Sequence, residues 1–247
     1  MRRIAAALAG GLITCTGALA GEVTVLSGGA IEPGLRSAVQ AFEAETGHRV
    51  RITFNTTPQI VARLAAGERF DVVIAPPQAI DTLSKDGKLG SDGVSVGRVG
   101  LGVAVRAGTP EPDVSSVEAL KRAIVEADSL VFNRASTGIY FENLLKTWSL
   151  YGSVEPKTTR YPDGASVMEH VLKGRGKDIA FGAITEMRLY AAKGLRYVGP
   201  LPAEVQNTTA YTALPMTGSP NAELARLLVE YFGSATSKKR FVEAGIE

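Results

Sequence analysis

The sequence predicts an α/β protein with two lobes, each built on a largely parallel sheet flanked by helices. Short apolar runs typical of strands alternate with amphipathic segments of helical period through most of the chain. Two further apolar stretches, at residues 99–105 and 211–214, separate these runs and predict two crossings between the lobes. The chain is therefore expected to leave one lobe, build a second and return, with a hinge at the crossings.

The first twenty residues predict a secretory signal peptide. Two arginines precede an apolar segment, and Ala18-Leu19-Ala20 is a small-x-small cleavage pattern, with cleavage expected after Ala20. The segment is too short to span a bilayer, so no membrane insertion is expected after processing. Cys15 leaves a lipoprotein open as an alternative, although Thr14 stands where that pattern has Gly or Ala. We expect a periplasmic protein.

The composition argues against several functional classes. The chain has 27 Lys and Arg residues against 25 Asp and Glu, and loss of the two arginines in the signal peptide leaves 25 of each. Such a neutral balance argues against nucleic acid as a partner. Cys15 is the single cysteine, so the processed chain has no disulfide, thiol nucleophile or thiolate metal site. His48 and His170 are far apart in sequence, and no metal, cofactor or histidine-based catalysis is expected.

The first lobe is predicted to open with two strand–loop–helix units and a third strand, which together make a parallel sheet. The expected elements are strands at residues 23–26, 50–54 and 71–75 and helices at residues 35–45 and 59–66. Gly28 and Gly29 follow the first strand, and Thr56 and Thr57 follow the second. We assign residues 21–104 to this part of the first lobe.

The second lobe is predicted to span residues 105–207, and residues 208–247 return to the first. The expected elements are strands at residues 130–132 and 179–184 and helices at residues 117–127, 139–148, 167–172, 185–192, 222–232 and 238–244. The loop at residues 133–138 leads directly into a helix, as does the loop at residues 163–166.

Four loops, at residues 27–32, 55–58, 133–138 and 163–166, are expected to face one cleft, because ligands of open parallel sheets bind beyond the carboxyl ends of the strands. Helix N-termini there offer free N–H groups and the positive end of the helix dipole, so an anion can bind without Lys or Arg. We expect a small anionic ligand and a monomeric protein. The candidate ligand-binding residues are Ser27, Gly28, Gly29, Thr56, Thr57, Arg134, Ser136, Thr137, Gly138, Tyr140 and Ser166.

Several motifs resemble those of a known family. They are Phe70-Asp71-Val72-Val73-Ile74-Ala75, Gly138-Ile139-Tyr140, Ile179-Ala180-Phe181-Gly182 and Ala244-Gly245-Ile246. From about Val23 onward the sequence resembles type II periplasmic solute-binding proteins, in particular the molybdate-binding proteins of ABC importers. The resemblance implies a two-lobed type II fold, an ABC permease as partner, and a ligand held by hydroxyls and backbone amides.

The sequence departs from the molybdate binders at two positions that the resemblance makes ligand contacts. The first loop reads Gly28-Gly29-Ala30, which leaves Ser27 as its only hydroxyl, and Phe181 stands where the family has a tyrosine. Each lost hydrogen bond to a charged ligand costs roughly 1.5–3 kcal/mol. We therefore expect another small anion, a carboxylate ahead of molybdate.

Some residues allow more than one interpretation. Glu32 could favour the start of a helix, or it could face the cleft, repel an oxyanion and favour a ligand with a hydroxyl or amino group. Arg134 could pair with a ligand carboxylate or form a surface ion pair. Thr56, Thr57 and Ser166 could instead cap helices, and Tyr140 could pack between the lobes.

Two other classes of function remain open. The first is a secreted sensor module that passes its ligand state to a membrane receptor. The second is an enzyme on the same fold, with Glu32 and Asp163 as a conceivable carboxylate pair that nothing in the sequence brings together. No Ser-His-Asp set or His-Glu metal signature is present, so an enzyme is not expected.

Overall fold

The computed structural model describes residues 20–247, and the predicted signal peptide with Cys15 lies outside these residues. Nine strands form one sheet in the order β2-β1-β3-β9-β4-β7-β5-β6, with β8 paired to β4. The strands are β1 (Glu22–Gly28), β2 (Arg49–Asn55), β3 (Val72–Ala75), β4 (Val94–Arg106), β5 (Ser129–Asn133), β6 (Thr158–Tyr161), β7 (Asp178–Ala183), β8 (Leu195–Pro200) and β9 (Thr208–Pro215). The predicted α/β class is confirmed.

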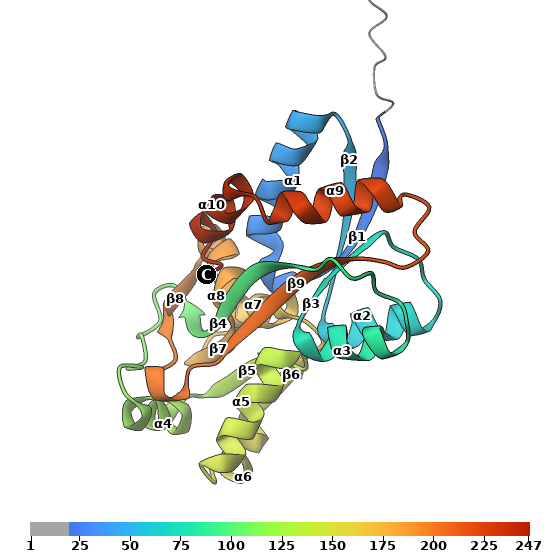
Figure 1. Cartoon of the computed structure of the whole chain (residues 1–247). Helices are drawn as coiled ribbons and strands as arrows, with labels where there is room; N and C mark the ends of the chain where they lie inside the picture. Colours follow the sequence, from blue (N-terminus) through green and yellow to red (C-terminus); the bar gives the residue numbers. More distant parts are fainter. Residues whose placement is uncertain (1–19) are drawn as a thin grey trace, which may run out of the picture.

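Helices cover both faces of this sheet (Figure 1). They are α1 (Glu32–Thr46), α2 (Thr57–Ala65), α3 (Pro77–Lys85), α4 (Val117–Glu126), α5 (Ser136–Thr147), α6 (Tyr151–Val154), α7 (Gly164–Lys173), α8 (Ile184–Leu189), α9 (Ala222–Phe232) and α10 (Ala235–Glu243). Within residues 20–247, no helix has the length and apolar character needed to cross a bilayer.

The sheet has two halves that share β4. In the first half β1 pairs in parallel with β2 and β3, and in the second half β5 pairs in parallel with β6 and β7. Residues 94–100 of β4 pair with β9, whereas residues 101–106 pair with β7 and β8. β4 and β9 therefore run side by side where the two halves join (Figure 1).

Each half of the sheet has an apolar core on both faces, because successive strand residues point to opposite sides. In the first half Val25 packs with α1, α9 and α10, and Leu26 packs with α2 and α3. In the second half Phe132 packs with α4 and α5, and Val131 packs with α7 and α8. Ile246 completes the first core, so residues near both ends of the described chain meet there.

Local sequence explains where the helices begin, including one that the sequence analysis missed. Pro76-Pro77 reads as the end of a strand, but Pro77 is the first residue of α3, a position that suits proline because the first helical N–H needs no acceptor. β4 begins at Val94 and not at residue 99, since Ser95, Gly97 and Arg98 interrupt the apolar run and an irregularity between Ser95 and Gly97 breaks the alternation of a regular strand. The predicted helix at residues 222–232 is confirmed as α9.

Candidate functional site

A cavity of about 270 Å³ lies where the two halves of the sheet meet. It is lined by Gly28, Gly29, Ala30, Glu32, Phe54, Asn55, Thr56, Thr57, Gln59, Asn133, Ala135, Ser136, Thr137, Asp163, Gly164, Ala165, Ala183, Glu186 and Tyr211. We call this cavity the central pocket. All four loops that the sequence placed at a cleft contribute residues to it, and the volume suits a small ligand.

The N-terminus of α5 presents backbone amides to the central pocket. Asn133, buried at the end of β5, accepts hydrogen bonds through Oδ1 from the N–H groups of Ala135 at 3.0 Å and Gly138 at 3.1 Å. The first N–H groups of a helix have no acceptor within the helix. Asn133 accepts the first-turn N–H of Gly138, while the residues Ser136 and Thr137 of the same turn line the pocket. The helix start is thus held rigidly and remains able to bind an anion.

Two more helices begin at the central pocket in the same way. Oδ1 of Asp163 accepts the N–H of Ser166 at 2.8 Å, which caps α7 and leaves the first-turn residues Gly164 and Ala165 on the pocket wall. At α2, Thr56 and Gln59 form a capping box in which the N–H of Thr56 donates to Oε1 of Gln59 at 2.9 Å. Three helix N-termini from both halves therefore converge on one small cavity.

The structure brings six of the sequence candidates to the pocket wall, namely Gly28, Gly29, Thr56, Thr57, Ser136 and Thr137. The others do not line it. Ser27 is fully buried, with its hydroxyl directed to the carbonyl of Gly28 at 3.1 Å, and the Tyr140 hydroxyl donates to the carbonyl of Val205 at 2.9 Å. Arg134 is exposed outside the pocket.

Gly138 and Ser166 give their N–H groups to Asn133 and Asp163, and neither residue lines the central pocket. Phe181, at the position of the family's tyrosine, is buried in the second core and stacks on Phe141 with ring centroids 3.7 Å apart. Ligand contact by any of the candidates stays a prediction.

Three carboxyl groups from separate elements border the central pocket: Glu32 on α1, Asp163 before α7 and Glu186 on α8. Glu32 pairs with Arg36 at 2.7 Å, and Asp163 caps α7. Glu32 is both the first residue of α1 and a pocket residue, so it starts the helix and also borders the cleft, while its effect on a ligand stays a prediction. Lys, Arg and His are absent from the residues that line the pocket.

Glu186 is placed at the base of the pocket by a close fit to two glycines. A Cβ on Gly29 would lie 3.1 Å from its Oε1, and a Cβ on Gly164 would lie 2.6 Å from its Cδ. Burial, followed by the negative charges of Asp163 and Glu32, raises the pKa of Glu186 from 4.5 to about 7. The group can therefore donate or accept a proton near neutral pH.

A contact between the halves holds α8 in place, because the hydroxyl of Thr185 donates to the carbonyl of Ala30. Within the first half, the Tyr211 ring packs so closely on Gly28 that a Cβ there would lie 2.6 Å from Cε1. Burial and the charge of Glu186 raise the pKa of Tyr211, so its hydroxyl stays neutral. Tyr211 thus offers the base of the pocket a neutral phenol beside Glu186.

Sequence reasoning missed Glu186, Tyr211 and Asn133. Glu186 follows a strand end directly, which is a signal that could have marked it, whereas Tyr211 reaches the pocket only because β9 returns between β3 and β4. Asn133 ends β5 just before a helix, and an Asn in that place is a recognisable capping signal.

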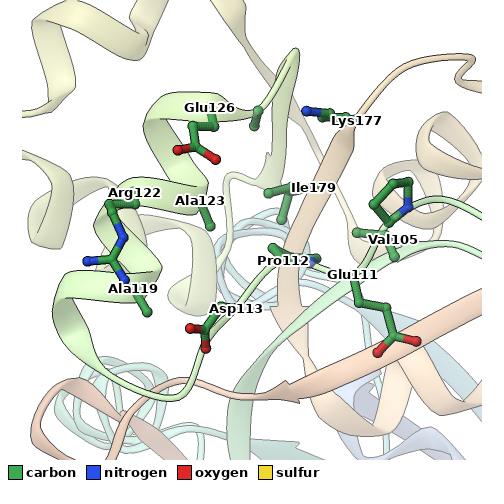
Figure 2. A pocket seen from close by; sticks show the side chains of 12 residues that line it. Val105, Glu111, Pro112, Asp113, Ala119, Arg122, Ala123, Glu126, Lys177 and Ile179 are labelled. Atoms are coloured by element: carbon green, nitrogen blue, oxygen red, sulfur yellow. The ribbon is translucent and has the colours of Figure 1, made fainter.

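A second cavity, of about 210 Å³, lies beneath α4 in the second half (Figure 2). Its floor is apolar, with Val105 and Ile179 facing Ala123. Glu111, Asp113, Arg122, Glu126 and Lys177 also line it. It is built from one half of the sheet only, and its charges are of both signs. The central pocket is the better candidate, because it joins both halves and gathers helix N-termini and Glu186.

Similar solved structures define the class of protein to which this fold and cleft belong. The periplasmic molybdate-binding protein of Azotobacter vinelandii matches with a TM-score of 0.74 at 13% identity, over 91% of this chain and 98% of that one. The sulfate-binding protein SubI of Mycobacterium tuberculosis matches with a TM-score of 0.74 at 17% identity, over 92% and 86%. The fold is that of the type II periplasmic binding proteins, as the sequence predicted.

The sequence comparison gives the family. Residues 23–247 match the family model described as bacterial extracellular solute-binding protein, and the chain belongs to this family. It is also 30% identical over 232 residues to an aconitate isomerase from a Pseudomonas species, over 91% of this chain and 87% of that protein.

Proposed function

We propose that the protein binds a small organic acid in the central pocket and delivers it, in the periplasm, to the permease of an ABC importer. The observation that carries the proposal is the convergence of the N-termini of α2, α5 and α7 on a cavity whose wall has no cationic side chain. Backbone amides can hold a carboxylate there without a salt bridge that would oppose release.

The carboxyl groups of the pocket favour an organic acid over an inorganic oxyanion. A doubly charged molybdate or sulfate ion would place its whole charge beside Glu32, Asp163 and Glu186. An organic acid separates its charge from its uncharged atoms and can bring a hydroxyl or a carbon chain to these groups. The aconitate isomerase is a relative named for a tricarboxylate, and it is far more similar in sequence than the oxyanion binders.

Ligand capture is proposed to close the two lobes around the pocket. Residues 21–104 and 208–247 would form one lobe and residues 105–207 the other, with the crossings in β4 and before β9 as the hinge. The change of partners in β4 between residues 100 and 101 and the pocket walls drawn from both halves support this arrangement.

A thermal-shift panel with the processed protein tests the proposal. The panel compares trans-aconitate, citrate, malate and succinate with molybdate, sulfate and a neutral sugar. At least one organic acid is expected to raise the melting temperature in a saturable manner, because it binds the folded state alone. Stabilisation by molybdate or the sugar, with no response to any of the acids, would contradict the proposal.

A second candidate function is isomerisation of an unsaturated organic acid, and Glu186 is the specific observation that favours it. Its carboxylate could remove a proton from a carbon next to a substrate carboxylate and, as the double bond shifts, return that proton to the other end of the allylic system. This step needs no oxidant or co-reactant, and a pKa of about 7 suits a group that must both take and give a proton.

An assay for product formation distinguishes the two candidate functions, solute binding and isomerisation. Incubation of the purified protein with trans-aconitate, followed by chromatography for cis-aconitate, should give product only if the isomerase candidate is right. Glu186→Gln would then abolish product formation while binding persists. Binding without product in the unmodified protein would contradict the isomerase candidate and is the result expected for a solute-binding protein.

A further inference from the structure

The carboxyl group of Glu186 is enclosed in a way that leaves the central pocket as its open side. Gly29 and Gly164 lie against it from the two halves of the molecule, and a side chain at Gly164 would displace the carboxyl group. No hydrogen bond to this carboxyl group is found among residues 20–247. Any group that satisfies it must therefore come from solvent or from a ligand in the pocket.

The charged and titratable groups that face Glu186 are all acidic, so none of them stabilises a negative charge on its carboxyl group. Glu32 faces it from α1, Asp163 from the turn before α7, Tyr211 from β9 and Tyr190 from the end of α8. Arg188, on the same helix, is exposed and its guanidinium lies over the Tyr197 ring at 5.6 Å, away from the pocket wall.

We propose that Glu186 is a specificity-determining residue that holds a proton whenever a carboxylate occupies the central pocket, so that ligand binding is coupled to proton uptake. The inference rests on the proposed binding and delivery of a carboxylate, and not on the isomerase candidate, in which Glu186 must be ionised when the substrate binds. A protonated Glu186 donates a hydrogen bond to a ligand oxygen, whereas an ionised one repels it.

This coupling gives the pocket selectivity that helix N-termini alone do not provide. The amides of α2, α5 and α7 attract any small anion. An anion binds next to Glu186 only when that carboxyl group is protonated. The protonated group then needs a hydrogen-bond acceptor on the ligand, and this acceptor must lie beside Gly29 and Gly164. A carboxylate of the right length meets both conditions.

The coupling predicts how the proton uptake on binding and the affinity for a carboxylate depend on pH. Glu186 of the free protein has a pKa of about 7, so binding at pH 7.0 takes up about half a proton, and binding at pH 5.5 takes up almost none. Between pH 7.0 and 8.0 the affinity should fall by about fivefold, because the free group must first be protonated. The carboxylates of the ligand stay largely ionised between pH 7.0 and 8.0, so the fall in affinity over this interval reports on the protein.

Isothermal titration calorimetry measures the proton uptake directly. The probe is trans-aconitate, followed by citrate, malate and succinate, titrated at pH 5.5, 7.0 and 8.0. At each pH two buffers are used that both have a pKa close to that pH but differ in ionisation enthalpy, and the difference in heat reports the protons exchanged. Glu186→Gln keeps a hydrogen-bond donor but has no proton to gain, so its affinity should be independent of pH and its uptake zero.

Two further variants serve as matched tests. Asp163→Asn retains the cap of α7 but removes one charge that faces Glu186, so the fall in affinity should begin at a lower pH. Glu126→Gln, which removes a carboxyl group from the cavity beneath α4, should behave as the unmodified protein.

The outcomes separate the inference from the function on which it rests. Binding by the unmodified protein with the same zero uptake as Glu186→Gln, or with an affinity that is flat between pH 5.5 and 8.0, would overturn the role of Glu186 and leave the carboxylate proposal standing. If none of the four acids binds at pH 5.5, where Glu186 is protonated, the proposed function itself is wrong.

Discussion

At pH values above 4.5, the ordinary pKa of a glutamate, Glu186 lowers the stability of the folded protein. Between pH 4.5 and 7 the folded state binds more protons than the unfolded state, so the free energy of unfolding falls as the pH rises through this window. Glu186→Gln should therefore stabilise the protein by about 1–3 kcal/mol at pH 8, and by little at pH 4.5. Urea denaturation at both values measures the difference, and an equal effect at the two would contradict the assignment.

Asp71 has the opposite effect on stability. Its carboxylate accepts hydrogen bonds from Ser219 Oγ at 2.6 Å, the N–H of Thr24 at 2.7 Å, Thr24 Oγ1 at 2.8 Å and Asn221 Nδ2 at 3.3 Å. Burial raises its pKa, but the hydrogen bonds outweigh burial and lower the pKa below 3.8. The stabilisation is present above pH 3.8 and is lost as the pH falls through the lowered value.

Asp71→Asn should accordingly cost about 1.5–3 kcal/mol at pH 7, because a neutral amide accepts these bonds less strongly. The cost should shrink at pH values below 3.8, where the native carboxyl itself takes up a proton. Urea denaturation measures both values. Asp81→Asn, on the exposed face of α3, is the control, and a similar cost for the two variants would argue against the network around Asp71.

At the scale of the element, the start of α5 depends on Asn133. Asn133→Ala leaves the N–H groups of Ala135 and Gly138 without their acceptor in a buried setting, and should cost about 2 kcal/mol in the free energy of unfolding. Asn143→Ala, on the exposed face of the same helix, should change it by less than about 0.5 kcal/mol. Equal costs in urea denaturation would show that the cap contributes nothing.

The first turn of α7 is predicted to tolerate no side chain at Gly164. A methyl group there would overlap the carboxyl of Glu186, so Gly164→Ala should displace that group and weaken binding of an organic acid at least tenfold, measured by calorimetry. Gly152→Ala in α6 is the matched control, because a Cβ at that glycine has no heavy atom within 4 Å. Unchanged affinity in Gly164→Ala would place the ligand elsewhere.

The sequence predicts an element when residues close together in the chain determine it, and fails when packing between distant segments determines it. The helical period of α9 and the apolar runs of the buried parallel strands reflect local burial, and they were predictable. α3 was missed because Pro77 serves a helix start as well as a strand end. Gly28, Thr56 and Ser136 were found because they follow strands, whereas Glu186 and Tyr211 reach the pocket through packing between the halves, which no local pattern specifies.

At the scale of the whole molecule, the last residues of the chain are part of the first core. Ile246 is buried between α1 and α10, and Glu247 pairs with Arg98 of β4 through a backbone hydrogen bond of 2.9 Å. Ile246→Ala should cost about 2–4 kcal/mol by urea denaturation. Val242→Ala, at an exposed position of α10, should cost less than about 1 kcal/mol, and an equal loss in both would contradict this packing.

The return of β9 between β3 and β4 also bears on how the polypeptide is made. Strands β1, β2 and β3 emerge early from a ribosome, but β9, the second partner of β3, and the helices α9 and α10 that cover this part of the sheet emerge last. The early segment therefore cannot reach its native state during most of translation. For a polypeptide with a predicted export signal, this delay maintains the loose, threadable form that a narrow translocation channel requires.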